Sequence, residues 1–163
     1  MEFDTLLRIL LWFAAVGCGV MAGVYFAFST FIMQSLASVP PAEGARAMQA
    51  INRVIVRSAF LPLFFATSAT CAAIIVFAAL GEGEPRQFAA IVGGAIYVVG
   101  MFVSTIALNI PLNNELDRVD VESEQGAAVW ARYLKVWTSR NHVRTIASTV
   151  ASVLLITALV GAG

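Results

Sequence analysis

Long uncharged stretches alternate with short polar connections along this chain. The uncharged stretches run over residues 9–42, 58–81, 87–114 and 145–163. A helix needs roughly 20 apolar residues to cross the hydrocarbon core of a bilayer, so the pattern predicts four membrane-spanning helices. The predicted spans cover residues 9–36, 58–80, 88–110 and 142–162. We therefore predict an all-α protein, an integral membrane four-helix bundle formed by a single domain over residues 1–163, with two interfacial amphipathic helices.

The first amphipathic helix is predicted over residues 42–56, directly after Pro40 and Pro41 end the first span. Its basic side chains share one face and its apolar side chains another, so we expect it to lie along the inner membrane surface. Asn52 lies between the two faces, and it is either a surface residue or a contact for a bound substrate. The second amphipathic helix lies in the latter half of the connection 116–140 and should run without a break into the fourth span.

Composition supports the membrane assignment. The hydrophobic fraction is 60%, the charged fraction is 12% and the mean hydropathy is +0.84, outside the usual range of soluble domains. Lys and Arg gather in the first and third connections, which predicts that both face the cytoplasm and that both termini lie outside. The formal net charge is zero, so we expect no nucleic-acid partner. The sequence leaves open whether the chain forms a homo-oligomer.

The metal-ligating residue types do not occur in a recognisable pattern. Cys18 and Cys71 lie in different predicted spans, and we interpret them as buried thiols. The acidic residues of 117–124 are expected to form a solvated loop, because no histidine accompanies them. A single histidine cannot supply two axial haem ligands within one chain. We therefore expect no metal and no cofactor.

The end of the third span carries two asparagines beside a proline. Pro111 cannot donate a backbone hydrogen bond, so it should kink the helix near residue 110. Thr105, Asn109 and Asn113 recur at four-residue steps and thus share a face. Each asparagine alone is typical of helix capping or interfacial solvation, whereas the pair beside a proline makes a functional role equally reasonable.

A second polar cluster stands where the fourth span begins. Residues 137–144 gather Trp137, Asn141, His142 and Arg144, and no charged residue follows them. Consecutive helices usually pack as neighbours, so this cluster should approach Asn109 and Asn113. We predict one pocket in the cytoplasmic half of the molecule, roofed by three aromatic side chains and the first amphipathic helix. The three aromatic residues are Tyr25, Phe28 and Trp137.

Such a pocket would combine apolar walls with one titratable base and several amide donors. This set can deprotonate a weak carbon acid, hold the enolate by hydrogen bonds and exclude water. The alternative is purely structural. Aromatic residues anchor helices at membrane interfaces and arginines extend toward water there, so the same residues also suit a simple boundary region.

Four segments resemble the anthrone oxygenase-like family of small four-helix membrane proteins, whose bacterial members are grouped as a domain of unknown function. They are residues 23–31 (GVYFAFSTF), 41–52 (PAEGARAMQAIN), 109–113 (NIPLN) and the stretch from Trp130 through 137–144 (WTSRNHVR). The resemblance implies a bacterial inner-membrane oxidoreductase that converts an anthrone, a tricyclic polyketide with an acidic methylene, to an anthraquinone with dioxygen and without a cofactor. It points to Asn109, Asn141 and Arg144 as site residues.

The leading hypothesis is accordingly an oxygenase-like enzyme acting on a hydrophobic aromatic small molecule. His142 would be the base, Asn109, Asn113 and Asn141 would hold the enolate or peroxide, and Arg144 would supply positive charge. Tyr25, Phe28, Trp137 and Asn52 would contact the substrate. The alternative is a non-catalytic membrane module that binds a hydrophobic ligand or a partner protein. A transporter subunit is less favoured, because no acidic residue lies within a span.

Overall fold

The computed structural model describes residues 2–81 and 85–161, and these residues form helices without any strand. The elements in chain order are α1 (Glu2–Ala27), the π-helical segment η1 (Phe28–Ile32), α2 (Met33–Ala37), α3 (Pro41–Ile55), α4 (Phe60–Ala79), α5 (Pro85–Tyr97), the π-helical segments η2 (Val98–Val103) and η3 (Thr105–Asn109), α6 (Ile110–Arg118) and α7 (Glu124–Val160).

Four continuous helical stretches are long and apolar enough to cross a membrane. They cover Thr5–Ala37, Phe60–Ala79, Arg86–Arg118 and Glu124–Val160. Each contains most of one predicted span. In addition, the fourth stretch begins well before residue 142, so the latter half of the third connection is helical and continuous with the fourth span, as predicted.

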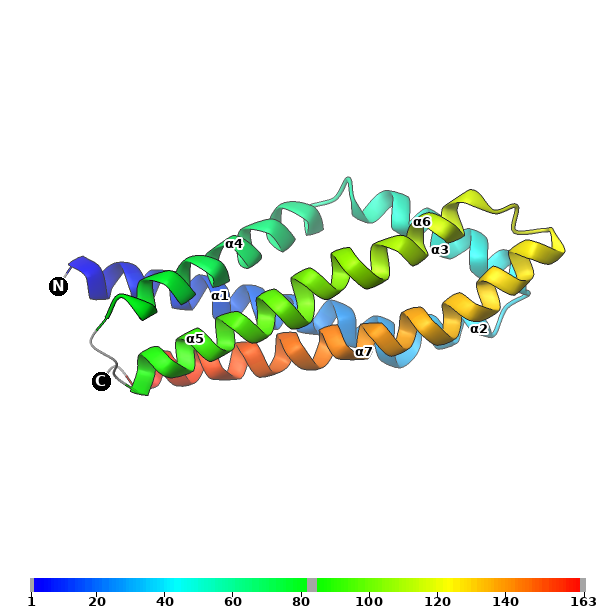
Figure 1. Cartoon of the computed structure of the whole chain (residues 1–163). Helices are drawn as coiled ribbons and strands as arrows, with labels where there is room; N and C mark the ends of the chain where they lie inside the picture. Colours follow the sequence, from blue (N-terminus) through cyan, green and yellow to red (C-terminus); the bar gives the residue numbers. More distant parts are fainter. Residues whose placement is uncertain (1, 82–84, 162–163) are drawn as a thin grey trace.

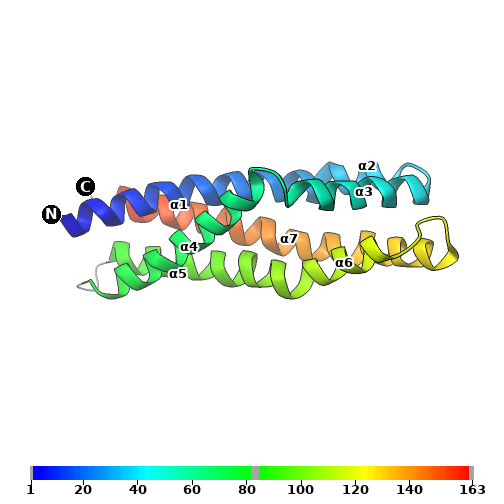
Figure 2. The same cartoon turned by 90° about the horizontal axis from the view of Figure 1, so that it is seen from above.

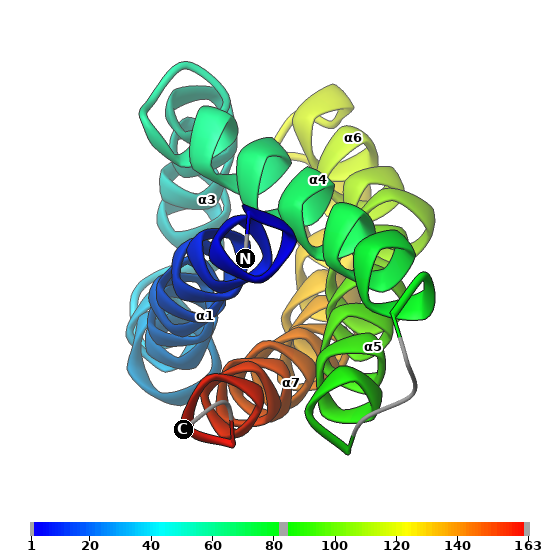
Figure 3. The same cartoon turned by 90° about the vertical axis from the view of Figure 1, so that its left-hand side faces the viewer.

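The long helices lie side by side (Figures 1 and 3). α7 packs against α1 and α5, and α4 packs against the same two helices from the other side. The start of α1 and the end of α7 lie at one end of the molecule, whereas the α2–α3 and α6–α7 turns lie at the other (Figure 1).

The third long helix extends further than predicted. The predicted membrane span was residues 88–110, with a kink at Pro111, and α6 continues the helix to Arg118. Pro111 occupies the first turn of α6, and the two π-helical segments directly precede this turn. Pro111 lies inside this continuous helix and removes one of its backbone hydrogen bonds, and π-helical adjustments such as η3 accommodate a proline within a helix.

The amphipathic helix α3 closely matches the predicted range. It runs back beside α2, along the length of the molecule (Figures 1 and 2). Gly44 makes this approach possible, because a Cβ there would lie 2.2 Å from the Leu36 carbonyl oxygen. The side chain of Gln49 is buried and its Nε2 donates to the Leu116 carbonyl at 2.9 Å. α3 is therefore held against α2 and α6, and its position along the membrane surface stays a prediction.

Ion pairs also connect the polar end of the molecule. Arg46 pairs with Glu122 at 2.7 Å, Arg53 pairs with Asp117 at 2.8 Å, and Arg132 pairs with Glu115. All six side chains are largely exposed, so each pair contributes little stability. Together the pairs link α3 to α6 and the following turn, and α6 to α7.

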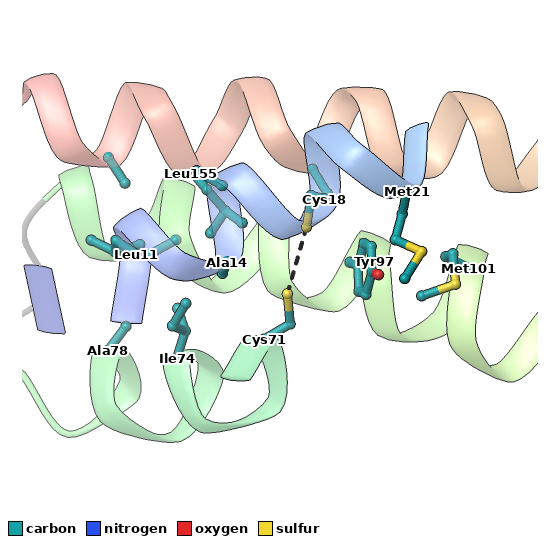
Figure 4. Close-up of a cluster of buried hydrophobic side chains, with 14 of the residues drawn as sticks. Leu11, Ala14, Cys18, Met21, Cys71, Ile74, Ala78, Tyr97, Met101 and Leu155 are labelled. Atoms are coloured by element: carbon teal, nitrogen blue, oxygen red, sulfur yellow. Dashed lines mark hydrogen bonds between the residues drawn. The ribbon is translucent and has the colours of Figure 1, made fainter. Parts of the chain in front are cut away.

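The buried apolar residues form two clusters. The larger lies among α1, α4, α5 and α7, and the smaller among α2, α3, α6 and the first half of α7. Figure 4 shows the larger cluster, where Cys18 and Cys71 are buried free thiols with their Sγ atoms 3.8 Å apart. α7 also bonds to α1, because Ser152 donates to the Ala15 carbonyl at 2.9 Å, whereas a Cβ on Gly23 would meet open space.

Candidate functional site

A cavity of about 150 Å³ lies where the two apolar clusters meet. Its walls come from α1 and η1 on one side, from α3 and α4 on another, and from η3, α6 and α7 on the third. The lining residues are Val24, Tyr25, Phe28, Met48, Ile51, Asn52, Ile55, Val56, Phe60, Leu61, Phe64, Phe65, Thr105, Ile106, Ile110, Asn113, Trp137 and Arg144. An apolar cavity of about this volume accommodates a single aromatic ring. Lining residues such as Phe65 and Ile110 are exposed, so the cavity is open and a larger flat molecule would extend through the opening.

Arg144 is the only cation among these lining residues. It is 5% exposed, and its guanidinium carbon lies 4.4 Å from the Tyr25 ring centroid and 4.9 Å from that of Trp137. Its Nη2 donates to Asn141 Oδ1 at 2.7 Å. Within residues 2–81 and 85–161 no carboxylate pairs with it, and its Nε has no partner. A buried charge without a counter-ion is costly, so the site is suited to an anionic ligand.

Asn141 holds Arg144 in place and joins α7 to α1. It is fully buried, and its Nδ2 donates to the Tyr25 carbonyl and to Ser29 Oγ, both at 2.7 Å. The Tyr25 carbonyl stands just before η1, where α1 widens into a π-helix. Such π-helical turns occur frequently at functional sites, and a second one, η3, carries the Thr105 side of the cavity.

Asn113 forms a second polar group on the cavity wall. Its Oδ1 accepts hydrogen bonds from the Tyr133 hydroxyl and from Trp137 Nε1, both at 2.8 Å. Asn52 on α3 donates to the same Tyr133 hydroxyl at 3.5 Å. The Tyr133 and Trp137 rings stack with their centroids 5.6 Å apart, so packing fixes both donors to Asn113.

Asn109 lies behind the wall and does not line the cavity. Its side chain is fully buried, and Nδ2 donates to the Trp137 carbonyl at 3.4 Å. Its Oδ1 has no partner among the described residues. Asn109 therefore connects η3 to α7 next to the indole that forms part of the cavity wall.

His142 does not reach the cavity. It is exposed and absent from the lining residues, although its neighbour Asn141 is fully buried. Successive residues of an α-helix point about 100° apart, so burying Asn141 and Arg144 turns His142 to the outer surface of α7. The prediction that His142 lies in the pocket with the asparagines is thus wrong.

The structure brings together six of the predicted site residues and adds others. Tyr25, Phe28, Asn52, Asn113, Trp137 and Arg144 line one cavity. Sequence reasoning did not assign Phe60 and Phe64 of the second span to the site, and it named Thr105 only as a member of the stripe with Asn109 and Asn113. The spacing of Phe60 and Phe64 places both rings on one helix face, and this was the available signal.

The assembled site can bind a flat, hydrophobic anion. The lining residues include no Asp, Glu or His, and no group of three or more His, Cys, Asp or Glu side chains suited to a metal occurs in the described part of the chain. The chemistry that these residues offer is aromatic packing, one buried positive charge and amide hydrogen bonds.

Comparison with known proteins identifies the family. A family model described as anthrone oxygenase matches residues 53–154, whereas no curated protein and no solved structure matches the chain. The matched range includes Asn113, Trp137 and Arg144, and it covers more than half of the chain. The chain belongs to the anthrone oxygenase family.

Proposed function

We propose that this protein is a membrane-embedded oxygenase that oxidises the acidic methylene of an anthrone-like aromatic compound with dioxygen. The observation that carries the proposal is Arg144, a buried guanidinium that no carboxylate of the described residues pairs with, on the wall of an apolar, aromatic cavity. Family membership supports the reaction type.

The proposed role of Arg144 is to stabilise the deprotonated substrate. Removal of a methylene proton from an anthrone places negative charge on the carbonyl oxygen, which becomes an enolate. An opposite charge within about 4–6 Å favours the ionised form of an acid by about 10- to 1,000-fold. A guanidinium held between Tyr25 and Trp137 and bonded to Asn141 offers that charge without reorganisation.

The remaining steps need only dioxygen. The carbanion passes one electron to dioxygen, and the two radicals combine to form a carbon–oxygen bond. The peroxide anion so formed takes up one proton from water, which balances the proton lost in the first step. The resulting hydroperoxide loses water, because its O–O bond and the remaining C–H bond of the same carbon break together. One dioxygen is consumed and one water is released for each methylene that becomes a carbonyl.

We propose that the first methylene proton of the substrate is not taken by His142, the base that the sequence suggested. His142 lies on the outer surface of α7, and no carboxylate lines the cavity. Several lining residues, including Val56, Phe65 and Ile110, are themselves exposed, so the cavity opens to the outside of the protein. We propose that the proton passes to water at this opening and that Arg144 supplies most of the catalytic effect.

The helix lengths suggest where the cavity stands in the membrane. α4 has 20 residues and would be about 30 Å long, which matches the hydrocarbon core. α7 has 37 residues and would be about 55 Å long. We propose a four-helix membrane bundle whose polar end, with α3, α6 and the first half of α7, extends into the cytoplasm. The cavity would then lie at the inner boundary of the bilayer, with both termini outside.

The test is dioxygen consumption and quinone absorbance with purified protein in detergent and an anthrone. Spontaneous oxidation by air requires a protein-free control and the Arg144→Met variant. Acceleration by the wild type that the variant loses would support the proposal. Equal rates in all three samples would contradict it.

A second candidate is a module that binds an aromatic anion without converting it. The absence of His, Asp and Glu from the lining residues favours this candidate. Binding of an anthrone that requires Arg144, together with no acceleration of its oxidation, would establish it in place of the oxygenase.

A further inference from the structure

The carboxamide of Asn113 has one defined orientation. Its Oδ1 accepts from both the Tyr133 hydroxyl and Trp137 Nε1 at 2.8 Å. Two donors on the oxygen leave the NH₂ group on the opposite side, because nitrogen cannot accept these bonds. No described residue accepts a hydrogen bond from Nδ2, and Asn113 lines the cavity. Its N–H donors are therefore available to a ligand.

Arg144 and Asn113 both line the cavity, and each contacts a different part of the Trp137 indole. Arg144 lies over the face of the Trp137 ring, whereas Asn113 contacts the Nε1 edge of that ring. A flat ligand that packs in this cavity can therefore meet a cation at one position and a neutral N–H donor at another. The remaining walls near Trp137 are apolar, including Phe28 with its ring centroid 5.7 Å from the indole.

We propose that Asn113 binds the second oxygen of the reaction, the one that dioxygen adds to the substrate carbon. This inference rests on the proposed function. Arg144 holds the oxygen that the substrate brings, and Asn113 donates an N–H to the peroxide oxygen attached to the reacting carbon and then to the new carbonyl. Because this bond is absent in the bound substrate, it lowers the barrier to turnover and leaves substrate affinity unchanged.

Tyr133 and Trp137 act as positioning residues in this account. They hold the Asn113 oxygen, and thus direct its nitrogen into the cavity, without contacting the second oxygen themselves. Asn52 on α3 donates to the Tyr133 hydroxyl at 3.5 Å, so α3 helps to hold the hydroxyl group that orients the Asn113 carboxamide.

The test compares two ligands that differ at the second oxygen. Anthrone has one oxygen, and anthraquinone has the second oxygen in place. Binding of each is measured under anaerobic conditions by quenching of tryptophan fluorescence. Asn113→Asp keeps the acceptor for Tyr133 and Trp137 but removes the N–H donor. We expect it to weaken anthraquinone binding about three- to tenfold more than anthrone binding and to lower kcat with little change in KM.

Three further variants serve as controls for the effect of Asn113→Asp. Asn113→Leu removes the donor without adding charge and should show the same selective loss. Tyr133→Phe leaves the amide held by Trp137 alone and should show a smaller loss in the same direction. Asn114→Asp changes an exposed neighbour and should leave the preference between the two ligands unchanged.

The outcomes separate this inference from the proposed function. Equal weakening of both ligands, or of neither, in Asn113→Asp and Asn113→Leu would overturn the assignment of the second oxygen to Asn113. If the wild type does not accelerate oxidation but the selective loss is still measured, the oxygenase proposal fails and Asn113 stands as an oxygen-binding group of a ligand site.

Discussion

Replacing Arg144 by methionine tests whether the buried charge serves stability or function. Methionine fills a similar volume with apolar atoms, so the variant removes the charge while keeping the site packed. The structure allows the two effects to be estimated separately, because all contacts of the guanidinium are known.

The effect on stability should be small. The variant loses two cation–π contacts, at 4.4 and 4.9 Å, each about 2 kcal/mol when desolvated. It also loses the 2.7 Å bond to Asn141, about 1.5–3 kcal/mol. Against this, it removes a desolvation penalty of several kcal/mol for an ion that is 5% exposed. These terms nearly cancel, so we expect the free energy of unfolding to change by about 2 kcal/mol or less.

The effect on an anionic ligand should be large. Removing one partner of a buried charge pair costs about 3–5 kcal/mol, which corresponds to a loss of affinity of about 100- to 4,000-fold. Binding of a deprotonated hydroxyanthrone under anaerobic conditions measures this quantity, and thermal unfolding in the same detergent measures stability. One kcal/mol shifts Tm by about 2–4 °C for a chain of this size.

Two results would refute the reasoning. A fall in Tm of more than about 10 °C in Arg144→Met would show that the guanidinium is chiefly structural. Unchanged affinity in a folded variant would show that the cation does not contact the ligand. Arg140→Met is the matched control, because Arg140 lies on the same helix outside the cavity and is partly exposed, with Nη1 donating to the Leu108 carbonyl.

Three further predictions concern other residues of the site and its frame. Asn141→Ala breaks hydrogen bonds to Tyr25, Ser29 and Arg144 and should lower the free energy of unfolding by about 3 kcal/mol. Thermal unfolding should show this as a fall in Tm of about 6–12 °C. Asn114→Ala, at an exposed position, is the control, and equal Tm values for the two variants would contradict the prediction. Gly44→Ala should destabilise by about 1–3 kcal/mol because its Cβ meets the Leu36 carbonyl oxygen, whereas Gly23→Ala, in open space, should be neutral or slightly stabilising in the same melts. His142→Ala should leave the oxidation rate unchanged because the side chain lies outside the cavity, and a tenfold loss of rate would return His142 to the reaction.

Much of the fold could be predicted from local sequence patterns. Uncharged stretches of membrane-spanning length identify the long helices, and Pro41 with an amphipathic run identifies α3. The stripe of Thr105, Asn109 and Asn113 correctly placed polar groups toward a neighbouring helix. The predicted span of the third helix stopped at residue 110, whereas the helix continues to Arg118, because the sequence alone does not show how a helix accommodates a proline such as Pro111.

By itself, the sequence determined which residues form helices and which clusters carry polar groups, because helix length and periodicity are local properties of the chain. Only the tertiary structure decided which of these groups share a cavity. Asn141 meets the Tyr25 carbonyl across 116 residues of sequence, and this contact turns Arg144 inward and His142 outward. Successive residues on a helix point about 100° apart. When α1 covers one face of α7, Asn141 and Arg144 are buried while His142, which stands between them in the sequence, is exposed.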